Sequence, residues 1–172
     1  HGTGTLTLKA DNLFTGATTL NAGTTVLDTS GRFSATSGVT VNHGAILTLD
    51  NAGGNPATAD RLGNKPLTLN GGRINLVGNS AGSTEGTAGN TLTVGSGQSV
   101  ISLTNNGGTT QFNFTTLTVN TGGFLNFTSG ATLGTATNRV LFSTSPTLTP
   151  ASGGILARVA VEGADFATYG AN

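Results

Sequence analysis

A six-residue motif recurs five times along the chain and constrains its fold more than any other feature. Each copy reads apolar–Thr–apolar, then Asn or Gly, a spacer and Gly, although the first begins with Thr18 instead of an apolar residue. The copies occupy residues 18–23, 39–44, 67–72, 92–97 and 117–122. Alternation with a period of two residues predicts a strand with one apolar face, and glycine supplies the positive φ that a tight turn needs.

A second apolar segment follows each motif, so the repeating unit is strand, turn, strand. The last apolar residues before the turns lie about 21 to 28 residues apart; they are Leu20, Val41, Leu69, Val94 and Val119. An isolated strand pair cannot bury its apolar face, whereas stacked coils bury all such faces in one core. We therefore predict an all-β fold, a parallel β-helix (β-solenoid) with coils of about 20–28 residues. These five residues would form its core, and its turns would contain Gly23, Gly44, Gly72, Gly97 and Gly122.

The composition supports strands joined by tight turns. Glycine, threonine and asparagine make up close to half of the 172 residues, and threonine favours strands while glycine and asparagine favour turns. A β-sandwich is the alternative, but it favours large aromatic anchors, and the chain has no Trp and one Tyr. The sequence therefore favours the β-helix over the sandwich.

Charge and cysteine content exclude several kinds of partner. Charged residues are 8% of the chain and the net charge is zero, so no field attracts nucleic acid or anionic lipid. The absence of cysteine excludes disulfides and thiolate metal sites. No apolar stretch of about 20 residues exists, so we expect no membrane insertion by this segment.

We predict one solenoid segment over residues 1–172, with divisions at 1–27, 28–137 and 138–172. The chain opens at His1-Gly2 without an initiator methionine, which suggests part of a longer protein. Polar segments at 51–56 and 78–86 are predicted loops, the parts of a fold that commonly carry binding. Strand-like sequence at both ends predicts two open solenoid edges without caps.

The first 27 residues carry a family resemblance. They contain Gly4-Thr5-Leu6-Thr7-Leu8, then Asn12, then Phe14-Thr15-Gly16, then Thr19-Leu20-Asn21-Ala22-Gly23. This order resembles the autotransporter-associated β-strand repeat, also called the passenger-associated transport repeat, although Ala10 stands where Gly is common. The resemblance implies a right-handed parallel β-helix and export to the bacterial cell surface as a passenger, where many members act as adhesins or scaffolds.

Three groups of residues are candidates for function. Asp28 and Asp50 follow successive turns and could form an acid/base couple or a calcium site, but solvated turn residues are the favoured interpretation. His43 has no second histidine nearby except His1, which favours an exposed turn residue over a catalytic base or metal ligand. Four threonines predicted at one outward position of successive coils could bind ice or a flat polymer, although threonine suits any exposed strand; they are Thr40, Thr68, Thr93 and Thr118.

We therefore predict a non-catalytic stalk or scaffold segment of an extracellular bacterial surface protein, related to adhesion. No catalytic, cofactor-binding or metal-binding residue is assigned, and the expected partners are surface glycans or polymers. An alternative is a self-assembling extracellular filament subunit, in which copies of the chain join end to end through strand pairing. A polysaccharide-cleaving β-helix enzyme is a third class, and the scattered acidic residues argue against it.

Overall fold

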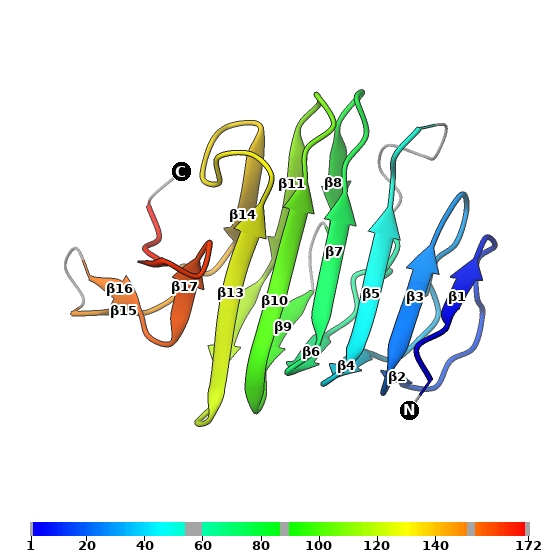
Figure 1. Ribbon diagram of the computed structural model, residues 1–172, viewed down its shortest axis with the longest axis horizontal. Coiled ribbons are helices and arrows are strands. Elements are labelled where there is room, and N and C mark those ends of the chain that lie inside the picture. Colours follow the sequence, from blue (N-terminus) through cyan, green and yellow to red (C-terminus); the bar gives the residue numbers. More distant parts are fainter. Residues whose placement is uncertain (1, 54–59, 87–89, 151–153, 171–172) are drawn as a thin grey trace.

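The computed structural model describes residues 2–53, 60–86, 90–150 and 154–170, which form a parallel β-solenoid. Successive coils stack along the long axis of the molecule, with β1 near one end and the β15–β17 region at the other (Figure 1). The described residues form eighteen strands and no helix, so none of them belongs to a helix able to span a membrane. The prediction of an all-β, parallel β-helical fold is confirmed.

Three sheets form the sides of the solenoid, and all their strand pairs are parallel except β17 with β18. The wide sheet contains, in spatial order, β1 (Thr5–Leu8), β3 (Gly23–Leu27), β5 (Ala45–Asp50), β7 (Arg73–Val77), β10 (Gly97–Thr104), β13 (Gly123–Ser129), β17 (Val159–Val161) and β18 (Asp165–Phe166). The second sheet contains β2 (Thr18–Leu20), β4 (Val39–Asn42), β6 (Leu67–Asn70), β9 (Thr91–Val94) and β12 (Thr116–Val119). The third contains β8 (Ser83–Glu85), β11 (Thr110–Phe114) and β14 (Asn138–Phe142).

Strand pairing joins residues that lie one coil apart in the sequence. In the second sheet, Val41 pairs with Leu69 and Leu69 pairs with Val94, all in parallel register. The coil length varies, because Asn42 lies 21 residues after Asn21 but 28 residues before Asn70. Connections of different length absorb this variation, so the motif positions stay in register.

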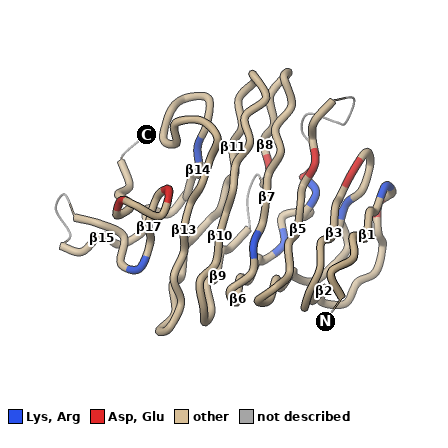
Figure 2. The backbone as a smooth tube through the Cα atoms, viewed as in Figure 1, with Lys and Arg blue, Asp and Glu red and all other residues tan. Residues whose placement is uncertain are grey.

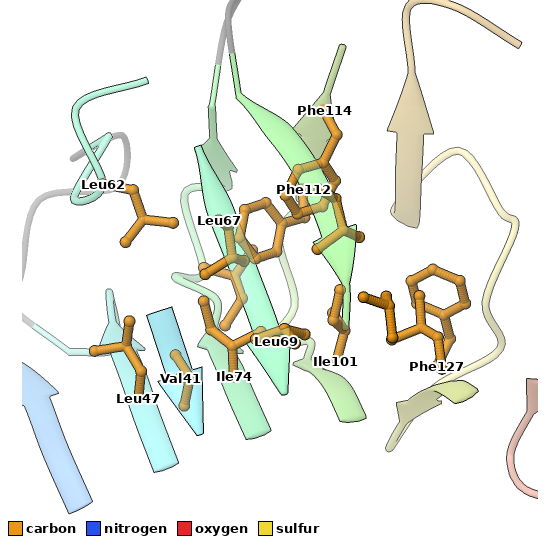
Figure 3. Close-up of a cluster of buried hydrophobic side chains, with 14 of the residues drawn as sticks. Val41, Leu47, Leu62, Leu67, Leu69, Ile74, Ile101, Phe112, Phe114 and Phe127 are labelled. Atoms are coloured by element: carbon orange, nitrogen blue, oxygen red, sulfur yellow. The ribbon is translucent and has the colours of Figure 1, made fainter. Parts of the chain in front are cut away.

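The interior is a continuous apolar core between the sheets. Val41, Leu69 and Val94 have no exposed surface. Side chains from the wide and second sheets meet inside the coil, as Figure 3 shows for Ile74 of the wide sheet and Leu69 of the second sheet.

Two of the five predicted core residues are only partly buried. Leu20 and Val119 pack against the core from β2 and β12, the outermost strands of the second sheet. Only one neighbouring strand of the sheet covers each of them, which explains their residual exposure.

The third sheet was not predicted. Residues 78–86 were expected to form a loop, but they contain β8, whose short Ser-Thr-Glu sequence carries no apolar alternation. The rings of Phe112 and Phe114 stack with centroids 4.5 Å apart, and Phe114 stacks on Phe142 of the next coil at 5.8 Å. Residues 54–56 of the other predicted loop lie outside the described residues.

The turn between the two strands of a coil has a left-handed glycine in each repeat. Gly23, Gly44, Gly97 and Gly122 have φ between 73° and 89°. In the third repeat the left-handed residue is Gly71, with φ 74°, and not the predicted Gly72.

Gly72 is required for a different reason. A Cβ atom on this residue would lie 2.4 Å from the carbonyl oxygen of Val41 in the preceding coil. Gly72 therefore allows the two backbones to approach each other closely.

The two ends of the solenoid differ, which corrects the prediction of two open edges. At the C-terminal end, β17 pairs with β13, and β18 folds back antiparallel onto β17. The short antiparallel pair β15 (Leu148–Thr149) and β16 (Ile155–Leu156) lies in the same region (Figure 1). Side chains of the same region contact the last strands of the other two sheets: Arg158 Nη2 donates to Val119 O of β12 at 2.6 Å, and Tyr169 Oη donates to Phe142 O of β14 at 2.8 Å.

Candidate functional site

A row of threonines runs along the outer side of the second sheet. Strand register places five of them side by side, one on each strand; they are Thr19, Thr40, Thr68, Thr93 and Thr118. Thr19 and Thr118 are exposed, and the other three are half-buried. Four members were predicted, and the structure adds Thr19. We call the outer side of β2, β4, β6, β9 and β12 the threonine face.

A second polar row runs beside the threonines at the corner of the coil. Asn42 Nδ2 donates to Asn21 Oδ1 at 2.7 Å, and Asn70 Nδ2 donates to Asn42 Oδ1 at 2.9 Å. The row stops at Gly95, where a Cβ atom would lie 1.9 Å from Asn70 Oδ1. These amide contacts hold three consecutive coils in register.

The threonine face is uncharged. None of its five strands contains Asp, Glu, Lys or Arg. Charged residues are few and scattered elsewhere along the solenoid (Figure 2). Because parallel strands are spaced about 4.8 Å apart, the face presents hydroxyl groups at regular intervals. Such a face can hydrogen-bond an uncharged polymer without stripping water from a charge.

Asp28 and Asp50 occupy equivalent places, as the sequence predicted. Leu27 of β3 pairs with Leu49 of β5, and the two aspartates come directly after these leucines. They therefore lie at the same corner of adjacent coils. Asp28 Oδ1 accepts from Thr29 N at 2.7 Å, and its other oxygen lies 3.6 Å from Lys9 Nζ. Asp50 Oδ1 accepts from Ala52 N at 2.9 Å. These contacts are those of turn-forming residues.

His43 is exposed in the turn between β4 and β5. Its Cβ and Cδ2 atoms lie 3.4 and 3.5 Å from the position that a Cβ on Gly71 would take, so the ring packs against the next turn. Within the described ranges, no group of three or more His, Cys, Asp or Glu residues could hold a metal ion.

A buried arginine near the third side of the solenoid was not singled out from the sequence. Arg61 has no exposed surface and donates Nε to Asn51 Oδ1 at 2.7 Å and Nη1 to Gly31 O at 2.7 Å. Its Nη2 donates to Thr29 O at 3.1 Å and to Asp50 O at 2.5 Å. Arg61 therefore links the corners of two coils through four hydrogen bonds from its three nitrogen atoms. Burial lowers the pKa of the guanidinium, and the negative charge of nearby carboxylates opposes this.

Glu85 is the acidic counterpart of Arg61 and is fully buried on β8. Its Oε1 accepts from Leu62 N at 2.9 Å, whereas Oε2 has no hydrogen-bond partner in the described structure. Desolvation raises the pKa of this carboxyl from 4.5 to about 7. A raised pKa is common in catalytic acids, but Glu85 has no exposed surface that a substrate could contact. Neither Arg61 nor Glu85 belongs to the repeated motif, so the repeat pattern contains no signal for them.

The comparisons with known proteins find no matching family model, no matching curated protein and no matching solved structure.

Proposed function

We propose that this chain is a structural, stalk-like segment of an extracellular bacterial surface protein, and that its threonine face adheres to an uncharged polysaccharide. The observation that carries this proposal is the uncharged threonine row across five paired strands, with the asparagine row beside it. The coil backbone positions these groups before binding, so little conformational entropy is lost on contact. Weak contacts repeated along one ligand chain add through multivalency.

The surroundings of the two candidate aspartates support a structural role over catalysis. Asp28 is engaged by Lys9 and a backbone amide, and Asp50 by a backbone amide of its own turn. Acid/base catalysis on a sugar needs two carboxyl groups free to contact the scissile bond from both sides. We therefore propose no enzymatic activity for this segment.

Export and surface location also belong to the proposal. They rest on the resemblance of the first 27 residues to a passenger repeat and on the absence of cysteine. Antibody labelling of intact and permeabilised cells that express the natural gene tests this location. Labelling that requires permeabilisation would contradict it.

Adhesion is tested by co-sedimentation of the purified chain with insoluble cellulose and chitin. The variant Thr91→Glu/Thr93→Glu places two charges on the outer side of β9 and should abolish sedimentation. The matched control, Val100→Glu/Ser102→Glu, changes two half-buried outward positions of β10 in the same coil and should sediment normally. Equal binding by both variants, or no binding by the unchanged chain, would overturn the adhesion proposal.

The same polysaccharides test cleavage. Release of soluble reducing ends that disappears in Asp50→Asn would establish an enzyme and contradict the structural proposal. We expect no release above that of buffer alone.

A further inference from the structure

The chain contains the sequence Asn-Gly-Gly at two places, residues 70–72 and 106–108. An asparagine that precedes glycine is especially prone to lose its side-chain amide, because glycine has no side chain to hinder attack by its backbone nitrogen. No other asparagine of the chain precedes glycine. Since the local sequence is the same at both places, a difference in their reactivity comes from the folded structure.

The first asparagine is held from several sides in the middle of the solenoid. Asn70 ends β6 and is half-buried, and its Nδ2 donates to Asn42 Oδ1 at 2.9 Å. The backbone nitrogen of Gly71, which would have to attack this side chain, donates to Oγ of fully buried Ser99 at 3.0 Å. Reaction at Asn70 therefore requires adjacent coils to separate at this corner.

The second asparagine lies in the loop between β10 and β11. Asn106 and Gly107 are both exposed, and a Cβ atom on Gly107 would meet nothing within 4 Å. Gly107 N donates to Asn105 Oδ1 at 2.8 Å, and Asn106 Nδ2 donates to Gly78 O of the preceding coil at 2.9 Å. Both bonds join residues outside the strands, so a local fluctuation of the loop breaks them while the sheets stay paired.

We propose that Asn106 deamidates spontaneously, and that the stacking of the coils protects Asn70 in the same local sequence. In the first step the backbone nitrogen of Gly107 forms a bond to Cγ of Asn106. The Cγ–Nδ2 bond breaks, and the amide leaves as ammonia with the proton that the backbone nitrogen loses. The resulting succinimide ring then adds a water molecule. Cleavage of the new N–Cγ bond gives aspartate, and cleavage of the original peptide bond gives isoaspartate, in which the main chain runs through Cβ and Cγ.

The product no longer fits the contact between the two coils. Gly108 packs so closely on the preceding coil that a Cβ atom on it would lie 2.3 Å from Gly82 N and 2.5 Å from Asn79 O. Isoaspartate lengthens the backbone just before this contact, and a carboxylate at position 106 cannot donate to Gly78 O. Deamidation should therefore loosen the loop from the preceding coil and add a negative charge to a chain of zero net charge.

Peptide mapping of the purified chain after storage in mildly alkaline buffer tests the proposal. Trypsin places the two asparagines in different peptides, 62–73 and 74–139, because Lys65 is followed by proline and is not cleaved. In the folded chain, acid should form at Asn106 at least about ten times faster than at Asn70, since only Asn70 waits for the coils to separate. In guanidinium chloride, where the coils are unfolded, the two asparagines should react at similar rates.

Two variants of the loop locate the reaction. Asn106→Gln keeps a side-chain amide but would have to close a larger ring, so acid formation at position 106 should nearly disappear. The matched control Asn105→Gln makes the same change at the neighbouring residue, which is not followed by glycine. It should deamidate at Asn106 at least as fast as the unchanged chain, because it disturbs the acceptor that holds Gly107 N.

The products and the rates decide the outcome. Isoaspartate at position 106 identifies the succinimide route, whereas aspartate alone would contradict it. Equal rates at the two asparagines of the folded chain would overturn the protection of Asn70 by the coils. Absence of acid at Asn106 in the folded chain, under conditions in which the unfolded chain reacts, would overturn the modification site itself.

Discussion

Glu85 Oε1 accepts a hydrogen bond from the backbone amide of Leu62 at 2.9 Å, across 23 residues of sequence. The carboxyl group thereby joins β8 to the turn of the preceding coil. Its second oxygen is buried without a hydrogen-bond partner in the described ranges, and Asp60 nearby adds a repulsive negative charge. Arg61 attracts it, but desolvation is the largest effect and favours the neutral acid.

Stability should therefore fall as pH rises from about 4.5 to neutrality. The folded-state pKa of Glu85 is about 7 against an ordinary 4.5, so the folded protein binds this proton more tightly than the unfolded chain does. The stabilisation is complete below pH 4.5 and is lost between pH 4.5 and about 7. It amounts to about 3 kcal/mol at most. Urea denaturation at pH 5 and pH 8 measures the difference.

The variant Glu85→Gln isolates this contribution. Glutamine keeps an oxygen that can accept from Leu62 N but does not ionise in this range, so most of the loss between pH 5 and pH 8 should disappear. An equally large loss in the variant would show that a different group titrates.

Removing Arg61 should destabilise the fold strongly. Arg61→Ala leaves the acceptors at Asn51 and Gly31 buried without their donor, at a cost of about 3 to 5 kcal/mol. Arg61→Lys should recover only part of this, because an ammonium group cannot match the planar fork of the guanidinium. Thermal melting of the three proteins ranks them, and a full recovery with lysine would contradict the role of geometry.

Two adjacent residues of β9 test which side of the second sheet faces inward. Val94 has no exposed surface, whereas Thr93 is half-buried on the outer side. Val94→Asp should cost more than about 4 kcal/mol because it buries an unpaired charge, and Thr93→Asp should cost less than about 1 kcal/mol. Similar melting temperatures for the two variants would contradict the inward assignment of Val94.

Close backbone contact between adjacent coils leaves no room for a side chain at Gly123. A Cβ on Gly123 would lie 2.1 Å from the carbonyl oxygen of Gly95, whereas a Cβ on Gly130 would meet nothing within 4 Å. Gly123→Ala should therefore destabilise the protein by more than about 2 kcal/mol, and Gly130→Ala should change stability by less than about 0.5 kcal/mol. Chemical denaturation of both variants checks the contrast.

The repeated motif was sufficient to predict the stacking of the coils. Side-chain direction alternates along a strand for local steric reasons, so Leu-Thr-Leu-Asn already indicates which residues face the core. The same repeat predicts that the threonines occupy one position on successive coils, and that Asp28 and Asp50 occupy another. The repeat does not predict the partial exposure of Leu20 and Val119, because that exposure depends on which strands lie at the ends of the sheet.

The spacing of the motif does not predict which glycine of the third turn is left-handed. Leu69 pairs with Val94 before the turn and Arg73 pairs with Val100 after it, so the fourth turn contains more residues than the third. The extra Ser99 is buried, and its Oγ accepts from Gly71 N at 3.0 Å and donates to Leu69 O at 3.3 Å. The left-handed position falls on Gly71 because this fit between coils, and not the motif, places the turn.

The sequence by itself determined the solenoid class, the inward and outward faces and the threonine row, because each depends on short-range alternation repeated at coil spacing. Only the tertiary structure decided the Arg61 and Glu85 cluster, the third sheet and the antiparallel fold-back of β18 onto β17 at the C-terminal end. These features depend on contacts between residues far apart in sequence, such as Tyr169 with Phe142 and Arg158 with Val119. Their energies come from desolvation and hydrogen-bond geometry that exist only once the coils have stacked.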